Sequence, residues 1–92
     1  MKKSASPQVT VWDTYVTKRD GATMHFDIIA PTEVSDPQTI YGYGRDYLQQ
    51  KGQAGQALAA EQWRRCHIEY LQPRWEQDIA QQGYAIIEIE GC

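Results

Sequence analysis

The sequence predicts an α+β (or mixed α/β) fold whose elements follow the order β-β-α-β-α-β. Alternating apolar and polar residues indicate strands near both ends of the chain. Two segments between them begin with proline, end before glycine and carry apolar residues at helical spacing, which predicts two long helices. A helix between two strands favours a parallel connection. We therefore expect an N-terminal antiparallel hairpin within a four-stranded mixed sheet, packed with two helices.

The composition limits the size and class of the protein. The chain has 92 residues, 41% hydrophobic and 23% charged, which suits one soluble domain; we assign residues 8–92 to it and residues 1–7 to a disordered tail. The net charge of −3 and the lack of a concentrated basic patch argue against nucleic acid. No apolar run approaches 18 residues, which argues against a membrane span. The N-terminus has no apolar segment typical of a signal peptide, so we expect a cytoplasmic protein with free thiols at Cys66 and Cys92.

The predicted hairpin joins strands over residues 8–17 and 22–30. Asp20 and Gly21 favour a tight turn because both tolerate positive φ. A loop of two residues and a loop of four residues both predict the same sharing of faces between the two strands. Asp13 is expected on the main core face, with the apolar residues Val11, Tyr15, Met24, Phe26 and Ile28. The opposite face is expected to carry Trp12, Val16, His25, Asp27 and Ile29.

The rest of the chain contributes two helices and two strands. The first helix is predicted from Pro37 to about Lys51, with Asp36 as its cap, and the second from Pro73 to about Gln82. Residues 53–65 give a weak signal, with room for a short helix near 59–65. Strands are predicted over residues 66–71 and 84–90. The last strand is apolar on both faces in its first half, which suggests a central place in the sheet.

Five segments of the sequence are similar to those of a known family. They are VWDTYV (residues 11–16), MHFDII (24–29), QTIYGYGRDYL (38–48), CHIE (66–69) and GYAIIEIEGC (83–92). On these segments the chain resembles the small bacterial domain-of-unknown-function family 2024. The resemblance implies a compact single-domain protein of this size, and it brings no established activity, substrate or cofactor.

A few polar residues are candidates for a functional site. His25 and Asp27 lie two apart on one strand, so both side chains can reach one ion. Zinc sites usually draw their ligands from close sequence pairs such as C-x₂-C, and this chain has none, so no metal or other cofactor is expected. Asp13, predicted among apolar side chains, would have a raised pKa unless it is paired. The candidate binding residues are Trp12, Asp13, His25, Asp27, Cys66, His67 and Glu69.

Cys66 and His67 are adjacent, and adjacent residues on a strand point to opposite faces. The imidazole therefore cannot easily deprotonate the neighbouring thiol, as a Cys-His nucleophile requires. We expect a non-enzymatic binding or protein-interaction module, with a homodimer, an unknown protein or a small molecule as its partner. The alternatives are a small metal-dependent or thiol/histidine enzyme that uses His25, Asp27, Cys66 and His67, and a structural subunit of a larger complex.

Overall fold

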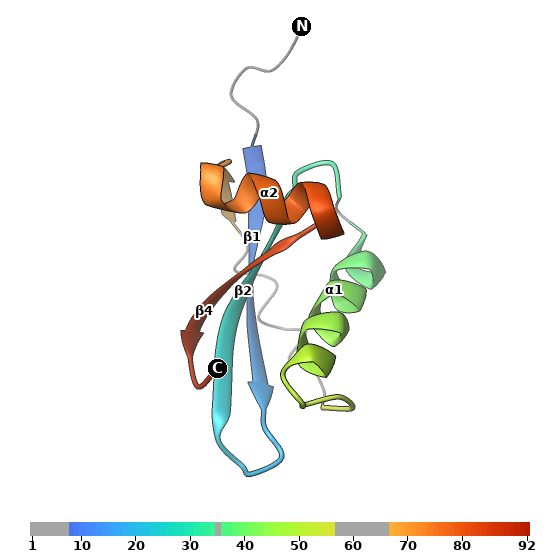
Figure 1. The fold of residues 1–92 in the computed structure, drawn as a ribbon, viewed down its shortest axis with the longest axis vertical. Coiled ribbons are helices and arrows are strands. Elements are labelled where there is room, and N and C mark those ends of the chain that lie inside the picture. Colours follow the sequence, from blue (N-terminus) through green and yellow to red (C-terminus); the bar gives the residue numbers. More distant parts are fainter. Residues whose placement is uncertain (1–7, 35, 57–66) are drawn as a thin grey trace, which may run out of the picture.

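The computed structural model describes residues 8–34, 36–56 and 67–92, with the side chain of His67 left aside. The predicted tail, the short helix near residues 59–65 and Cys66 lie outside these ranges. The α+β class, the element order and the N-terminal hairpin are confirmed (Figure 1). The elements are β1 (Gln8–Thr17), β2 (Thr23–Pro31), α1 (Pro37–Gln50), β3 (His67–Tyr70), α2 (Pro73–Gln82) and β4 (Ala85–Glu90).

The sheet has the strand order β3-β1-β2-β4, and every neighbouring pair is antiparallel. It is therefore antiparallel throughout, whereas the sequence predicts a mixed sheet. The strands β2 and β3 do run in the same direction, as the connection through α1 favours, but β1 lies between them, so they form no parallel pair. The expected central place of β4 is also wrong, since β4 forms an edge of the sheet.

The hairpin loop reverses the expected pairing of its two faces. Lys18 N donates to Ala22 O at 2.7 Å, and Gly21, with φ at 91°, completes a loop with an odd number of residues. Trp12 consequently pairs with Ile28, so these two side chains share a face. The predicted loop of two or four residues would have shifted one strand by one residue and turned all of its side chains over.

Each face of the sheet carries one of the two described helices (Figure 1). The helix α1 begins at the cap Asp36, whose side chain accepts from Gln38 N. It packs along one face over the main core, made of Trp12, Val16, Met24, Phe26, Ile28, Ala30, Ile40, Tyr47, Leu48 and Tyr84. The helix α2 crosses one end of the other face over a smaller core, made of Val9, Val11, Ile29, Trp75 and Ala85.

Polar side chains connect α1 to the edge strand β4 through a hydrogen bond and an ion pair. Tyr47 donates its hydroxyl hydrogen to Glu88 Oε2 at 2.5 Å, and Lys51 Nζ lies 3.1 Å from the same carboxylate oxygen. These contacts lower the pKa of Glu88, and burial and the bond to Glu88 raise the pKa of Tyr47. Among the described residues, no helix has the length and hydropathy to cross a membrane.

Candidate metal centre

Three successive rungs of side chains cross the α2 face of the sheet, because residues that pair across antiparallel strands point to the same face. The rung beneath α2 is apolar, and the two rungs beyond it are largely polar. From α2 outward, the rungs are Val11, Ile29 and Ala85; then Asp13, Asp27 and Ile87; then Tyr15, His25 and Glu90.

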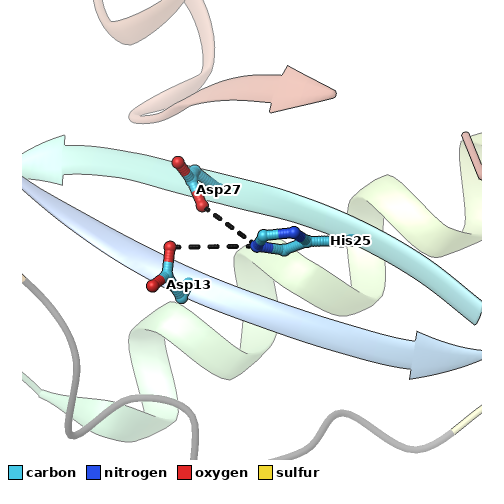
Figure 2. Close-up of side chains that lie close together, drawn as sticks. All are labelled: Asp13, His25 and Asp27. Carbon is cyan, nitrogen blue, oxygen red and sulfur yellow. Dashed lines mark ion pairs between the residues drawn. The ribbon is translucent and has the colours of Figure 1, made fainter. Parts of the chain in front are cut away.

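Asp13, His25 and Asp27 converge on one point of this face (Figure 2). His25 Nε2 lies 3.9 Å from Asp13 Oδ1 and 3.8 Å from Asp27 Oδ1. Both distances exceed those of direct N–H···O hydrogen bonds, which are about 2.7 to 3.2 Å. His25 Nε2 therefore faces both carboxylate oxygens without forming a direct hydrogen bond to either of them.

Two of these atoms are buried without a partner. His25 Nε2 and Asp27 Oδ1 find no hydrogen bond among the described residues, and Asp27 is only 9% exposed. A buried polar atom without a partner costs about 1 to 3 kcal/mol, so most native structures satisfy such atoms. The Tyr15 ring stacks on the His25 ring, with the centroids 4.1 Å apart and the planes 12° from parallel, and this contact holds the imidazole in place.

The carboxyl group of Asp13 lies beside that of Asp27 and contributes, after burial, to the shift in the pKa of Asp27. Asp13 and Asp27 are directly opposed across the hairpin. Burial raises the pKa of Asp27 to about 7, and the adjacent Asp13 carboxyl adds to the shift. Near neutral pH this side chain therefore exchanges a proton, and strongly perturbed groups of this kind concentrate at functional sites.

The geometry fits a divalent ion. Each residue offers one ligand atom, and the three atoms lie within 4.8 Å of one another. Metal bonds of about 2.1 Å place neighbouring ligand atoms about 3.0 to 4.2 Å apart. Small rotations of the three side chains would bring their ligand atoms to these separations. A neutral imidazole with two carboxylates balances the charge of a divalent ion, and this ligand set suits first-row ions such as Zn²⁺ or Fe²⁺.

Two other sequence-predicted candidates, Trp12 and Glu69, lie elsewhere, and Cys66 and the side chain of His67 are outside the part of the chain that the structure describes. Trp12 is buried in the core beneath α1, on the opposite face of the sheet. Glu69 is exposed on β3, where its backbone pairs with that of Val9, and His67 pairs with Val11 in the same ladder. Of the seven candidates, the structure thus brings together Asp13, His25 and Asp27.

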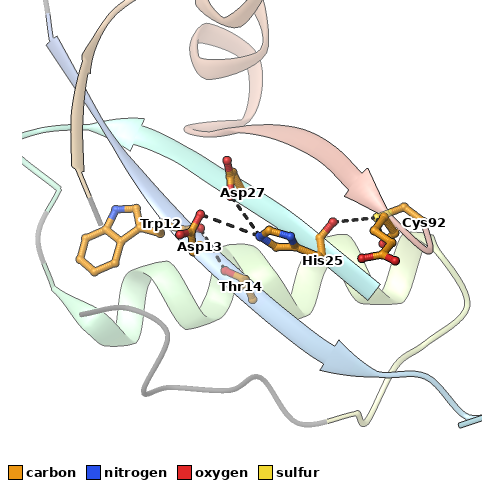
Figure 3. A network of polar contacts seen from close by, with 7 residues as sticks. Trp12, Asp13, Thr14, His25, Asp27 and Cys92 are labelled. Atoms are coloured by element: carbon orange, nitrogen blue, oxygen red, sulfur yellow. Dashed lines mark hydrogen bonds and ion pairs between the residues drawn. The ribbon is translucent and has the colours of Figure 1, made fainter. Parts of the chain in front are cut away.

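The prediction from the sequence pattern that Asp13 lies on the main core face is wrong. Tyr15 was not among the predicted site residues. Both residues alternate with buried positions on β1, and with the correct loop length this pattern would have placed them beside His25. Cys92 lies near His25 in space, but its Sγ approaches the backbone oxygen of His25, at 3.5 Å (Figure 3). The thiol is thus a neighbour of the strand rather than of the polar cluster.

The fold and the sequence agree with a known family. Among solved structures, the chain is similar to the NMR structure of protein NE1680 from Nitrosomonas europaea, with 33% identity and a TM-score of 0.75. That match covers 92% of this chain and 98% of the other chain. Comparison with curated proteins gives no match. The sequence model described as "Domain of unknown function (DUF2024)" matches residues 7–89, and the chain therefore belongs to the DUF2024 family.

Proposed function

We propose that the protein binds a divalent first-row transition-metal ion through Asp13, His25 and Asp27. The observation that carries this proposal is the pair of buried, unbonded atoms, His25 Nε2 and Asp27 Oδ1, which face each other at 3.8 Å. An ion between them and Asp13 would give each atom a partner. It would also offset the charge of Asp13 and of the buried Asp27, whose ionised form is otherwise disfavoured by burial and by the adjacent Asp13 carboxyl.

A purely structural role for the cluster is the main competing explanation. A histidine that only stabilises the hairpin would form direct hydrogen bonds with the carboxylates, at the usual hydrogen-bond distances. Here Asp27 is held instead in a state that disfavours its ionised form at neutral pH. An arrangement that costs stability in the metal-free protein is typical of a binding site.

This proposal narrows the role expected from the sequence, a non-enzymatic binding module in the cytoplasm. A metal-dependent enzyme stays the alternative, now with Asp13 in the ligand set. A homodimer also stays a proposal, although the exposed apolar face from which it was inferred is not present among the described residues. Trp12, Val16 and Ile29, which the sequence left for a partner to cover, are buried by the protein's own helices and strands.

The test is a binding measurement on untagged protein, stripped with a chelator and dialysed at pH 7.5. Titration calorimetry with Zn²⁺, Co²⁺ and Mn²⁺, with native mass spectrometry for stoichiometry, should show one bound ion per chain. D27N and H25Q should each weaken binding at least about 100-fold, since loss of a ligand costs more than loss of an outer-shell contact.

The matched control is E76Q, which removes an exposed carboxylate from α2. It should bind the ion as the wild type does. Equal weakening by all three variants, or one-to-one binding that survives D27N and H25Q, would contradict the assignment of the site.

A further inference from the structure

The edge strand β4 has backbone groups that point away from the sheet. Among the described strands, β4 has a neighbour on one side only, β2. The bond from Lys18 N to Ala22 O makes these two residues a hydrogen-bonded pair of the hairpin, and such pairs recur at every second residue of antiparallel strands. Counted from there, the β2 residue opposite Ile87 bonds to β4 and not to β1. The N–H and C=O groups of Ile86 and Glu88, on either side of Ile87, therefore point outward.

A groove of about 590 Å³ lies beside these outward groups. Its lining comes from α1, α2 and β4, and it includes the buried residues Tyr47 and Trp75. Ile86, Ile87 and Glu88 all line it. The side chains of Ile86 and Ile87 point to opposite faces of the sheet, so the groove follows the open edge of β4 rather than one face.

One contact inside the groove already has the form of a strand pairing. Gln82 Nε2, on α2, donates to Tyr84 O at 3.0 Å. Tyr84 precedes Ile86 by two residues, so its carbonyl group belongs to the same outward row. The side-chain amide of Gln82 thus bonds to the first carbonyl group of the edge as the amide of an added strand would. The outward groups of Ile86 and Glu88 continue this row along the groove.

From these observations we propose that the groove binds an extended peptide segment of another protein, which pairs antiparallel with β4 as an added strand. A peptide backbone supplies N–H and C=O groups at the two-residue spacing of Ile86 and Glu88. Every neighbouring pair in the sheet is already antiparallel. Aliphatic side chains of the peptide would lie against Trp75 and Ile87 on the α2 side, where they bury apolar area.

The charges around the groove favour an uncharged segment. Arg74 and Asp78 contribute one charge of each sign to the lining, and Glu88 Oε2 lies 3.1 Å from Lys51 Nζ. A second copy of β4 would add two exposed carboxylates, those of Glu88 and Glu90. Charged side chains on an edge strand oppose pairing of that strand with itself, so a peptide of different sequence is favoured over a second copy.

The probe is a fluorescein-labelled peptide of sequence TVTITVT with blocked ends, titrated with the protein in a chelator and followed by fluorescence anisotropy. Binding should saturate at one peptide per chain. Two N-methylated versions carry their methyl groups on alternate amides, so that one set faces β4 and the other faces solvent. One version should bind at least about tenfold more weakly than the parent peptide, and the other should bind as the parent does, because only one set donates to β4.

Amide exchange measured by NMR gives a second readout. In the free protein, the amides of Ile86 and Glu88 should exchange faster than those of Ala85 and Ile87, which donate to β2. The peptide should slow the exchange of the outward pair at least about tenfold. The variants E88A and E88P both lose the carboxylate, and only the proline also removes an outward N–H. E88P should therefore bind the peptide at least about fivefold more weakly than E88A.

Several outcomes would overturn the proposal. Equal affinities of the two methylated peptides, equal affinities of folded E88P and E88A, or unchanged exchange at Ile86 and Glu88 would show that the peptide does not pair with β4. No binding of the parent peptide up to about 1 mM would exclude the segment proposed. Slow exchange of the two outward amides in the free protein that is lost on dilution would assign the edge to a second copy. Because every measurement is made in a chelator, these outcomes are independent of the metal site.

Discussion

Replacing Asp27 by asparagine should stabilise the metal-free protein at alkaline pH. The substitution keeps the size of the side chain and removes a buried negative charge next to Asp13. The amide can also donate a hydrogen bond to the Asp13 carboxylate. Most buried substitutions destabilise a protein, so a gain in stability here would be specific evidence that the site is adapted to an ion.

The size of the effect follows from the shift in the pKa of Asp27 from 3.8 to about 7. Below pH 3.8 this carboxyl is protonated in both the folded and the unfolded chain, and it adds no pH dependence. Between the two pKa values the unfolded chain loses the proton first, so stability falls as the pH rises and stays low above pH 7. Each pKa unit corresponds to about 1.4 kcal/mol, so D27N should gain about 2 to 4 kcal/mol at pH 8 and almost nothing at pH 4.

The assay is urea and thermal unfolding followed by circular dichroism, in a chelator, at pH 4, 6, 7 and 8. At pH 8 the gain should raise the melting temperature by about 10 °C or more. Zn²⁺ at a thousand times its dissociation constant should reverse the order, because the ion then stabilises the wild type by about 4.1 kcal/mol and does not stabilise the variant. D78N, which removes an exposed carboxylate from α2, is the control and should change little at any pH.

One result would refute this reasoning. If D27N lowers the free energy of unfolding by the same amount at pH 4 and pH 8, the ionised carboxylate is satisfied within the protein itself. Asp27 would then be a structural residue, and the raised pKa would have no role in ion binding.

Four further predictions concern ion binding and the stability of the surrounding structure. Metal affinity should fall about tenfold per pH unit below pH 7, because the ion must displace the proton from Asp27; a flat affinity between pH 5.5 and 7 in titration calorimetry would contradict this. Y47F should cost about 1 kcal/mol in urea unfolding and raise the pKa of Glu88 measured by NMR, since that carboxylate loses a donor; an unchanged Glu88 titration would count against the bond. G91A should destabilise the protein by about 1 to 3 kcal/mol, because φ is 73° and the new Cβ would lie 2.2 Å from a β2 carbonyl oxygen. G42A, in the interior of α1 with open space around it, should instead stabilise by up to about 1 kcal/mol, and the two melting curves together test the backbone geometry.

Local sequence signals were sufficient for most of the secondary structure. Proline and a capping residue begin α1, and a proline begins α2, because these features act within one turn of helix. Alternation likewise located the strands of the hairpin and showed that His25 and Asp27 share a face. Each of these signals depends on residues near one another in the chain.

Which faces come together was decided by the tertiary structure. An odd hairpin loop reverses the relation between the two strands, and this single residue moves Asp13 from the expected core to the side of His25 and Asp27. The edge position of β4 depends on long-range packing, since a helix over each face buries Tyr84 and Ala85 as fully as a central position would. The sequence by itself therefore determined the elements and the candidate residues. Register and packing between distant segments decided that three of those residues meet, because periodicity along one strand contains no information on how its faces match those of the next.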